Sequence, residues 1–228
     1  MASSRFRDLA NLPRQRAFRL LHLHFTTFAA LCTCALALLV LVAGCQRGPS
    51  LSPLGPDAVV LAFGDSLTHG NGAADGRDYP AQLQRLIGRR VVNAGIPGEV
   101  TAEGRRRLPQ VLDEVRPDLL VLCHGGNDFL RHSSEKRAAA NLAAMIEAAR
   151  GRGIEVLLVG VPRPGLLLAP APFYEELADQ YGIPCEDEIL SDILADRDLK
   201  SDPIHPNADG YRRLAAAIAE TLEKAGAI

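Results

Sequence analysis

The chain has 228 residues, of which 47% are hydrophobic and 23% are charged, and its formal net charge is −2. These proportions fit one globular domain with a sizeable core and exclude a disordered or fibrous chain. Acidic residues outnumber basic ones, and the imbalance grows when the arginine-rich first 44 residues are set aside. The sequence therefore predicts no nucleic-acid partner.

Residues 1–44 have the pattern of an export signal. Five arginines precede an apolar run over residues 25–42, which ends in Leu-Val-Ala-Gly followed by Cys45. A basic segment, an apolar segment and small residues before a cleavage site are typical of a signal peptide. Residues 41–45, Leu-Val-Ala-Gly-Cys, resemble the lipobox of bacterial lipoproteins, which implies that Cys45 becomes the lipidated N-terminus. An uncleaved anchor is the alternative, because the 18 residues of the run are just long enough to cross a bilayer.

The sequence thus divides into a lipoprotein signal peptide at 1–44, a linker at 45–56 and a folded domain at 57–228. The linker is rich in glycine, proline and serine, which disfavour a helix. Gln46, rather than an aspartate, follows the cysteine. By the sorting pattern of bacterial lipoproteins, we expect an exported protein, anchored by lipid in the outer membrane and facing the periplasm.

Strands and helices alternate through the folded domain. Short apolar runs bounded by turn residues predict five strands, at 58–62, 90–93, 118–123, 154–161 and 183–185. Apolar residues at helical spacing predict five helices, at 79–87, 101–115, 138–150, 173–181 and 207–224. This alternation predicts an α/β fold, with a doubly wound, five-stranded parallel sheet between layers of helices. The arginines at 105–107 are expected to face solvent and are given no function.

The first predicted strand is followed by Phe63 and then by Gly64-Asp65-Ser66-Leu67. Gly64 allows the backbone to turn sharply where the strand ends. Ligands of open α/β sheets bind at the carboxyl ends of the strands, so Ser66 is a candidate nucleophile. Gly-Asp-Ser is also common in ordinary turns, and this motif alone does not establish catalysis.

Three further clusters fall at the same predicted edge or just before the last helix, namely residues 93–98, 125–128 and 202–205. A catalytic serine needs a base, and the base needs a group that fixes its tautomer. Asp202 and His205 lie three residues apart in a turn stiffened by prolines. This spacing lets the carboxylate reach one ring nitrogen while the other points toward the serine.

The developing oxyanion of an acyl transfer needs preorganised hydrogen-bond donors. The backbone amides of Ser66 and Gly98 and the side-chain amide of Asn127 are suited to that role. Asp65 and Asp128 are expected to bond neighbouring backbone and hold the loops. Each cluster on its own can be interpreted as an ordinary turn. The Ser66 motif and the three further clusters in this order, at one edge of the sheet, favour catalysis.

With these four blocks, the sequence resembles the SGNH hydrolases, also called GDSL esterases and lipases. The resemblance covers residues 59–218 and is strongest to bacterial enzymes with arylesterase, thioesterase and lysophospholipase activity. It implies a three-layer α/β/α sandwich of flavodoxin-like topology, a triad of Ser66, Asp202 and His205, and no cofactor. The lipobox cysteine departs from those enzymes, and so does His124, which replaces a small or apolar residue. This histidine is expected to form a hydrogen-bonding wall of the site.

An apolar groove for the acyl group is expected beside the catalytic residues, since ligand pockets are mostly apolar with a few placed polar groups. Its predicted lining is Phe129, Leu130, Leu166, Leu167 and Leu168. No set of cysteine, histidine and carboxylate residues has metal-ligand spacing, so no metal is predicted.

The sequence therefore predicts a membrane-tethered serine esterase that hydrolyses carboxylic esters through an acyl-enzyme on Ser66, with aryl esters, lysophospholipids and thioesters as candidate substrates. A carbohydrate deacetylase on the same fold is one alternative, against which the apolar loop argues. A lipoprotein that only binds lipid or envelope components is another, but such a protein needs no triad.

Cys123 is expected to be an inert core thiol. Its pairing with Cys185 and the oligomeric state stay open.

Overall fold

The computed structural model describes residues 48–165 and 168–228. The strands of this part of the chain are β1 (Val59–Gly64), β2 (Arg90–Gly95), β3 (Leu119–Cys123), β4 (Glu155–Val159) and β5 (Cys185–Glu186). The helices are α2 (Ser66–His69), α3 (Tyr79–Ile87), α4 (Thr101–Val115), α5 (Gly126–Leu130), α6 (Glu135–Arg150), α7 (Phe173–Tyr181), α8 (Ile189–Ala195) and α9 (Ala208–Lys224), with a 3-10 turn at Arg197–Leu199.

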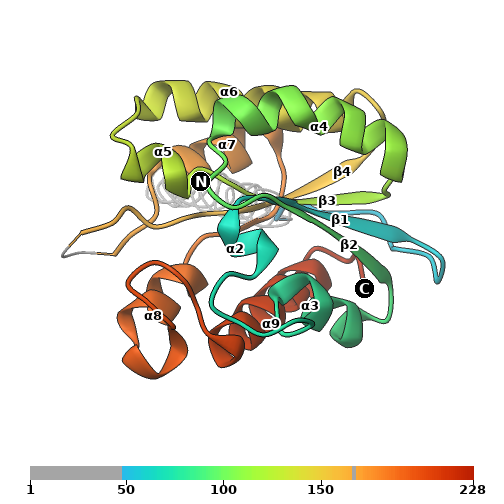
Figure 1. Cartoon of the computed structure of the whole chain (residues 1–228). Coiled ribbons are helices and arrows are strands. Elements are labelled where there is room, and N and C mark those ends of the chain that lie inside the picture. Colours follow the sequence, from blue (N-terminus) through green and yellow to red (C-terminus); the bar gives the residue numbers. More distant parts are fainter. Residues whose placement is uncertain (1–47, 166–167) are drawn as a thin grey trace, which may run out of the picture. The chain divides into compact units, whose positions relative to one another are not determined.

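All five strands are parallel and form one sheet in the order β2-β1-β3-β4-β5. Helices α4, α6 and α7 cover one face of this sheet, and α3, α8 and α9 cover the other (Figure 1). The predicted three-layer α/β/α sandwich with a five-stranded parallel sheet is therefore confirmed. The loops that follow β1, β2 and β3 all emerge at one edge of the sheet, which we call the catalytic edge.

The middle strands are unbroken aliphatic runs because helices cover both of their faces. Every residue of β3 is buried, as are four of the five residues of β4. Three fully buried tyrosines tie helices to the catalytic edge: Tyr79 bonds the hydroxyl of Thr68 in α2, Tyr174 donates to the carbonyl oxygen of His124, and Tyr211 donates to that of Asn71. Each phenol satisfies its own polar group while it fixes a loop near Ser66.

Residues 51–54 form hydrogen bonds to the domain, in contrast to the free linker that the composition of this segment predicts. The backbone N–H groups of Leu51 and Leu54 donate to the carbonyl oxygens of Ala225 and Ala227 at 2.9 and 2.8 Å. The backbone and hydroxyl of Ser52 donate to the carboxylate of Glu155, the first residue of β4. These contacts hold residues 51–54 at the amino ends of the strands, opposite the catalytic edge.

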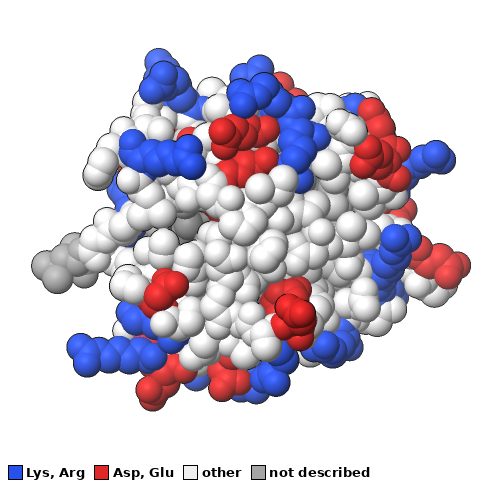
Figure 2. Space-filling model, viewed as in Figure 1, with Lys and Arg blue, Asp and Glu red and all other residues white. Residues whose placement is uncertain are grey.

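The surface carries charges of both signs. Figure 2 shows lysine and arginine side chains beside aspartate and glutamate, around a largely uncharged middle of the face that it displays. That face has no broad basic patch of the kind that binds nucleic-acid phosphates.

Within residues 48–165 and 168–228, no helix combines the length and apolar character needed to cross a membrane. Cys123 and Cys185 are both free thiols, and burial raises the pKa of each above the usual thiol value.

Candidate active site

Ser66 is the first residue of α2 and lies directly beyond the end of β1. At Gly64 a Cβ atom would overlap the carbonyl oxygen of Cys123 in the neighbouring strand, so this position requires glycine. Asp65 then caps α2, because its carboxylate accepts a hydrogen bond from the backbone N–H of Leu67 at 3.1 Å. Strand end, glycine and cap together place the Ser66 hydroxyl at the catalytic edge.

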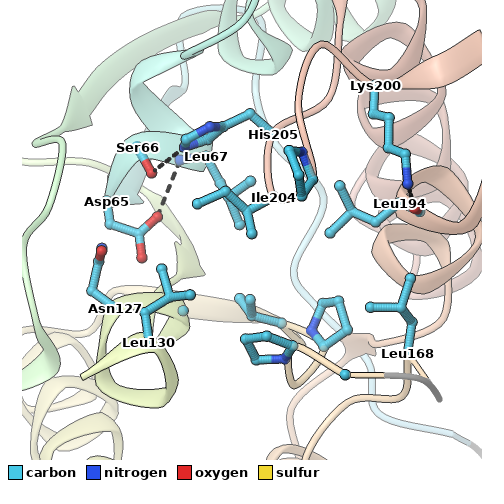
Figure 3. A pocket seen from close by; sticks show the side chains of 16 residues that line it. Asp65, Ser66, Leu67, Asn127, Leu130, Leu168, Leu194, Lys200, Ile204 and His205 are labelled. Atoms are coloured by element: carbon cyan, nitrogen blue, oxygen red, sulfur yellow. Dashed lines mark hydrogen bonds between the residues drawn. The ribbon is translucent and has the colours of Figure 1, made fainter. Parts of the chain in front are cut away.

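A hydrogen-bonded chain joins Ser66, His205 and Asp202 (Figure 3 shows the first two). The Oγ of Ser66 lies 3.0 Å from Nε2 of His205, and Nδ1 of His205 lies 2.8 Å from Oδ2 of Asp202. The other carboxylate oxygen of Asp202 accepts the backbone N–H groups of Ile204 and His205, each at 2.9 Å. The structure thus brings together the three residues that the sequence motifs nominate as a triad.

The electrostatics of this hydrogen-bonded triad allow His205 to act as a base beside Ser66. Burial on its own would raise the pKa of Asp202, but hydrogen bonds from His205 and from the backbone of Ile204 outweigh it and hold the pKa below the ordinary aspartate value. An ionised Asp202 accepts the Nδ1 proton of His205, which leaves the lone pair of Nε2 facing Ser66. This tautomer can remove the hydroxyl proton.

Asn127 and Gly98, the two remaining candidates for oxyanion donors, lie in α5 and in the turn between β2 and α4. The Nδ2 of Asn127 donates to the backbone oxygen of Glu99 at 3.0 Å, and Nη2 of Arg131 donates to that of Gly98 at 2.8 Å. Gly98 has a φ of 80°, which favours glycine. A side-chain amide nitrogen carries two hydrogens, so Asn127 keeps one donor for a ligand. The oxyanion-hole assignment stays a prediction.

Both aspartates that were expected to hold loops contact neighbouring backbone. Asp128 accepts the backbone N–H and the hydroxyl of Thr101, each at 2.8 Å, and so joins α5 to the start of α4. Asp65 bonds Leu67 through one oxygen, while its other oxygen, Oδ2, is buried without a hydrogen-bond partner among the described residues. Burial accordingly raises the pKa of Asp65.

A cavity of about 320 Å³ opens beside Ser66 (Figure 3). Ser66 and His205 lie on one side of it, and Leu194 and Lys200 lie on the opposite side. Most of the lining is apolar: Leu67, Leu130, Val161, Pro162, Pro164, Leu168, Leu194, Pro203 and Ile204. An apolar cavity with a reactive hydroxyl at one end is suited to an acyl group.

Of the residues expected to line the groove, Leu130 and Leu168 line the cavity, whereas Phe129 does not. Phe129 is only 9% exposed and packs against Phe173, with ring centroids 6.1 Å apart. The reason is that this segment is helical, and neighbouring residues of a helix point about 100° apart. Leu166, Leu167 and Cys45 lie outside the described residues.

A buried polar cluster behind the site corrects two of the sequence interpretations. Arg107 was placed in solvent and His124 in the wall of the site, and Glu99 was given no role. In the structure Glu99 accepts bonds from Arg107 at 2.8 and 2.6 Å and lies 3.2 Å from Nε2 of His124. His124 is completely buried and does not line the cavity. Arg107 follows the buried Gly104 by three residues, and this helical spacing was the available signal.

Comparison with known proteins shows which family the chain is similar to. Residues 62–213 match the model of the GDSL-like Lipase/Acylhydrolase family. Esterase TesA of Pseudomonas aeruginosa is 36% identical over 130 residues, which cover 55% of this chain and 65% of that protein. Thioesterase 1/protease 1/lysophospholipase L1 of Escherichia coli is 27% identical over 172 residues, which cover 72% of this chain and 83% of that protein.

Comparison with solved structures points to the same family. The crystal structure of AlinE4, described as an SGNH-hydrolase family esterase, superposes with a TM-score of 0.59 at 36% identity, covering 75% of this chain and 98% of AlinE4. The family match spans more than half of the chain and includes Ser66, Asn127, Asp202 and His205. The chain belongs to the GDSL-like lipase/acylhydrolase family of SGNH-type ester hydrolases.

Proposed function

We propose that the protein hydrolyses acyl esters through a covalent acyl-enzyme on Ser66. The observation that carries this proposal is the continuous hydrogen-bonded chain from Ser66 through His205 to Asp202 at the mouth of an apolar cavity. Ester hydrolysis by a serine nucleophile needs this arrangement, because a hydroxyl is a weak nucleophile until a neighbouring base takes its proton.

The reaction follows from the geometry. The Oγ of Ser66 attacks the carbonyl carbon of the ester as its proton moves to Nε2 of His205, and the carbonyl oxygen becomes an oxyanion. The backbone N–H of Ser66 and Gly98 and the side chain of Asn127 are the donors for that charge. Collapse of the tetrahedral species expels the alcohol or thiol, which takes the proton from His205. Water then attacks the acyl carbon while His205 takes one of its protons. The bond from that carbon to Oγ of Ser66 breaks, His205 returns the proton to Oγ, and the carboxylic acid leaves.

The cavity favours substrates with a medium or longer acyl chain. Its far side is formed by Leu168 and Leu194, and each buried methylene is worth about 0.8 kcal/mol of binding, or roughly fourfold in affinity. The curated relatives named for esterase, thioesterase and lysophospholipase activities support aryl esters, acyl thioesters and lysophospholipids as the substrate classes to test. A deacetylase needs no such apolar space.

The substrate proposal is tested with p-nitrophenyl esters from acetyl to palmitoyl on a chain that begins at Gly48, beside an acyl thioester, a lysophospholipid and an acetylated sugar. We expect kcat/KM to rise by roughly fourfold per methylene until the cavity is filled, and then to level off. A maximum at acetyl, with turnover of the acetylated sugar, would instead identify a deacetylase. Binding of the lipid without turnover of any ester would favour the purely lipid-binding protein.

We further propose that Cys45 is lipidated and tethers the enzyme to the bacterial outer membrane. The support is the lipobox pattern before this cysteine and Gln46 after it. The chain enters the described domain through residues 48–54, whose contacts lie at the amino ends of the strands, opposite Ser66. A tether attached there leaves the catalytic edge open to esters that diffuse through the periplasm.

The anchor is tested in the full-length chain with Cys45→Ser. We expect fatty-acid labelling to disappear and the protein to leave the detergent-extracted membrane fraction, because several acyl chains at about 0.8 kcal/mol per buried methylene provide the anchor. Cys185→Ser is the matched control, since Cys185 is also a free thiol and should leave labelling unchanged. A wild-type protein that never takes up labelled fatty acid rules the lipoprotein proposal out.

A further inference from the structure

Behind the catalytic edge, Glu99, Arg107 and His124 form a polar cluster that takes no part in the proton transfer. Glu99 and His124 are buried, and Arg107 is partly buried. Glu99 is 7% exposed, and its carboxylate receives a two-pronged contact from the Arg107 guanidinium at 2.8 and 2.6 Å. His124 contacts the same carboxylate at 3.2 Å. Burial alone would raise the pKa of Glu99, but the bonds from Arg107 and His124 outweigh it and lower the pKa to about 2. The cluster therefore holds a carboxylate that is ionised at neutral pH.

The backbone of Glu99 contacts a residue of the proposed oxyanion hole. Its carbonyl oxygen accepts the Nδ2 hydrogen bond of Asn127 at 3.0 Å, and Gly98 is the preceding residue. Two of the three proposed oxyanion donors are therefore attached directly to Glu99, one by a peptide bond and one by a hydrogen bond. A shift of Glu99 by a fraction of an ångström moves both donors.

Arg107 connects Glu99 to the strands on which the site is built. Its Nη2 also donates to the carbonyl oxygen of Ala94 at 3.1 Å, and its guanidinium lies 4.0 Å from the centroid of the Phe63 ring. Ala94 belongs to β2 and Phe63 to β1, which ends just before Ser66. An arginine held by a bidentate carboxylate, a carbonyl and an aromatic face has little freedom to move.

We infer that Glu99 is a positioning residue for the oxyanion hole, locked by Arg107 and His124 so that Gly98 and Asn127 keep the geometry that the transition state requires. This inference rests on the proposed roles of Gly98 and Asn127. Burying an ion pair adds little to stability compared with an apolar pair of the same size, which makes a specific geometric role the better account of this one. Catalytic rate is sensitive to such geometry, because a misplacement of about 1 Å can cost about 100-fold.

The experiment compares Glu99→Gln with Asn127→Ala and with the control Asp113→Asn. Glutamine keeps the shape of Glu99 but loses its charge. Asp113→Asn removes an exposed ion pair with Arg152 from α4, the helix that carries Arg107. We expect kcat to fall by about 10-fold to 100-fold in Glu99→Gln with KM within a few fold. Asn127→Ala should lose about 100-fold to 1,000-fold, and Asp113→Asn should keep wild-type kinetics.

A trifluoromethyl ketone supplies a readout that a purely structural role would not move. It forms a tetrahedral oxyanion on Ser66, so its inhibition constant should rise in Glu99→Gln in parallel with the loss of kcat/KM, while the KM of the ester stays level. Arg107→Lys is the second variant, because it keeps the charge but loses the bidentate fork, and it should show the same pattern if Glu99→Gln fails to fold.

The outcomes separate this inference from the proposed function. If Asn127→Ala lowers kcat while Glu99→Gln and Arg107→Lys leave both kcat and ketone inhibition unchanged, Glu99 does not position the oxyanion hole. If Asn127→Ala itself has no effect, the oxyanion-hole assignment is wrong, and the inference falls with it. A lower melting temperature with unchanged kcat in Glu99→Gln would likewise overturn the inference and leave a structural ion pair.

Discussion

Ser66→Ala is expected to abolish ester turnover, leaving a residual rate lower by about five to six orders of magnitude. Alanine removes the Oγ atom that forms the acyl-enzyme, and His205 then has no hydroxyl to activate at 3.0 Å. In serine hydrolases, loss of the nucleophile alone costs about as much as loss of the whole triad. Binding of the acyl group should persist, because the apolar lining of the cavity is untouched.

This result is measured as single-turnover release of p-nitrophenol together with labelling by a fluorophosphonate, which reacts with an activated serine. Wild type should incorporate one label per chain at Ser66, and Ser66→Ala should incorporate none. Ser134→Ala is the matched control, since Ser134 is exposed and its side chain makes no capping hydrogen bond. Wild-type turnover by Ser66→Ala would show that another residue is the nucleophile.

The layers of the fold were predictable because strands buried on both faces must be continuous aliphatic runs, and amphipathic helices must alternate with them. Short elements were harder. Residues 126–130 contain glycine, asparagine and aspartate, which are poor helix formers, and α5 exists because Asp128 bonds Thr101 and Asn127 bonds Glu99.

Helix α8 was missed although Leu190, Ile193 and Leu194 have helical spacing. Residues 48–56 read as a linker, because pairing with residues 225–227 depends on contacts more than 170 positions away.

The candidate site shows the same division between local and distant signals. Asp202 and His205 could be paired from sequence because they are three positions apart and both lie in one turn. Ser66 and Asn127 could be placed at one edge because parallel strands end together. The contact of Glu99 with His124 could not be foreseen, since a turn and a strand end meet there only after α4 has packed on the sheet. Gly104 provides the room, because a Cβ at that position would meet the His124 ring at 2.5 Å.

Asp202→Asn is expected to lower kcat by about 10,000-fold with little change in KM. Asparagine can present its NH₂ group to Nδ1 of His205, which favours the tautomer with a proton on Nε2, facing Ser66. That tautomer cannot accept the hydroxyl proton, and a neutral amide does not stabilise the imidazolium that forms in the transition state. The cavity and the oxyanion donors stay in place, so the loss appears in kcat.

The pH dependence provides a check on the same residue. The pKa of Asp202 lies below the ordinary aspartate value, so in the wild type its carboxylate stays ionised while the pH falls from about 8 to 5. Asp202 should therefore add no acid limb of its own to the pH profile of activity over that range. Asp198→Asn is the control, because Asp198 is an exposed aspartate just before the same turn, and it should keep both the rate and the pH profile of the wild type. If Asp202→Asn retains kcat within tenfold of wild type across this range, Asp202 does not orient the base, and another acceptor must fix the tautomer of His205.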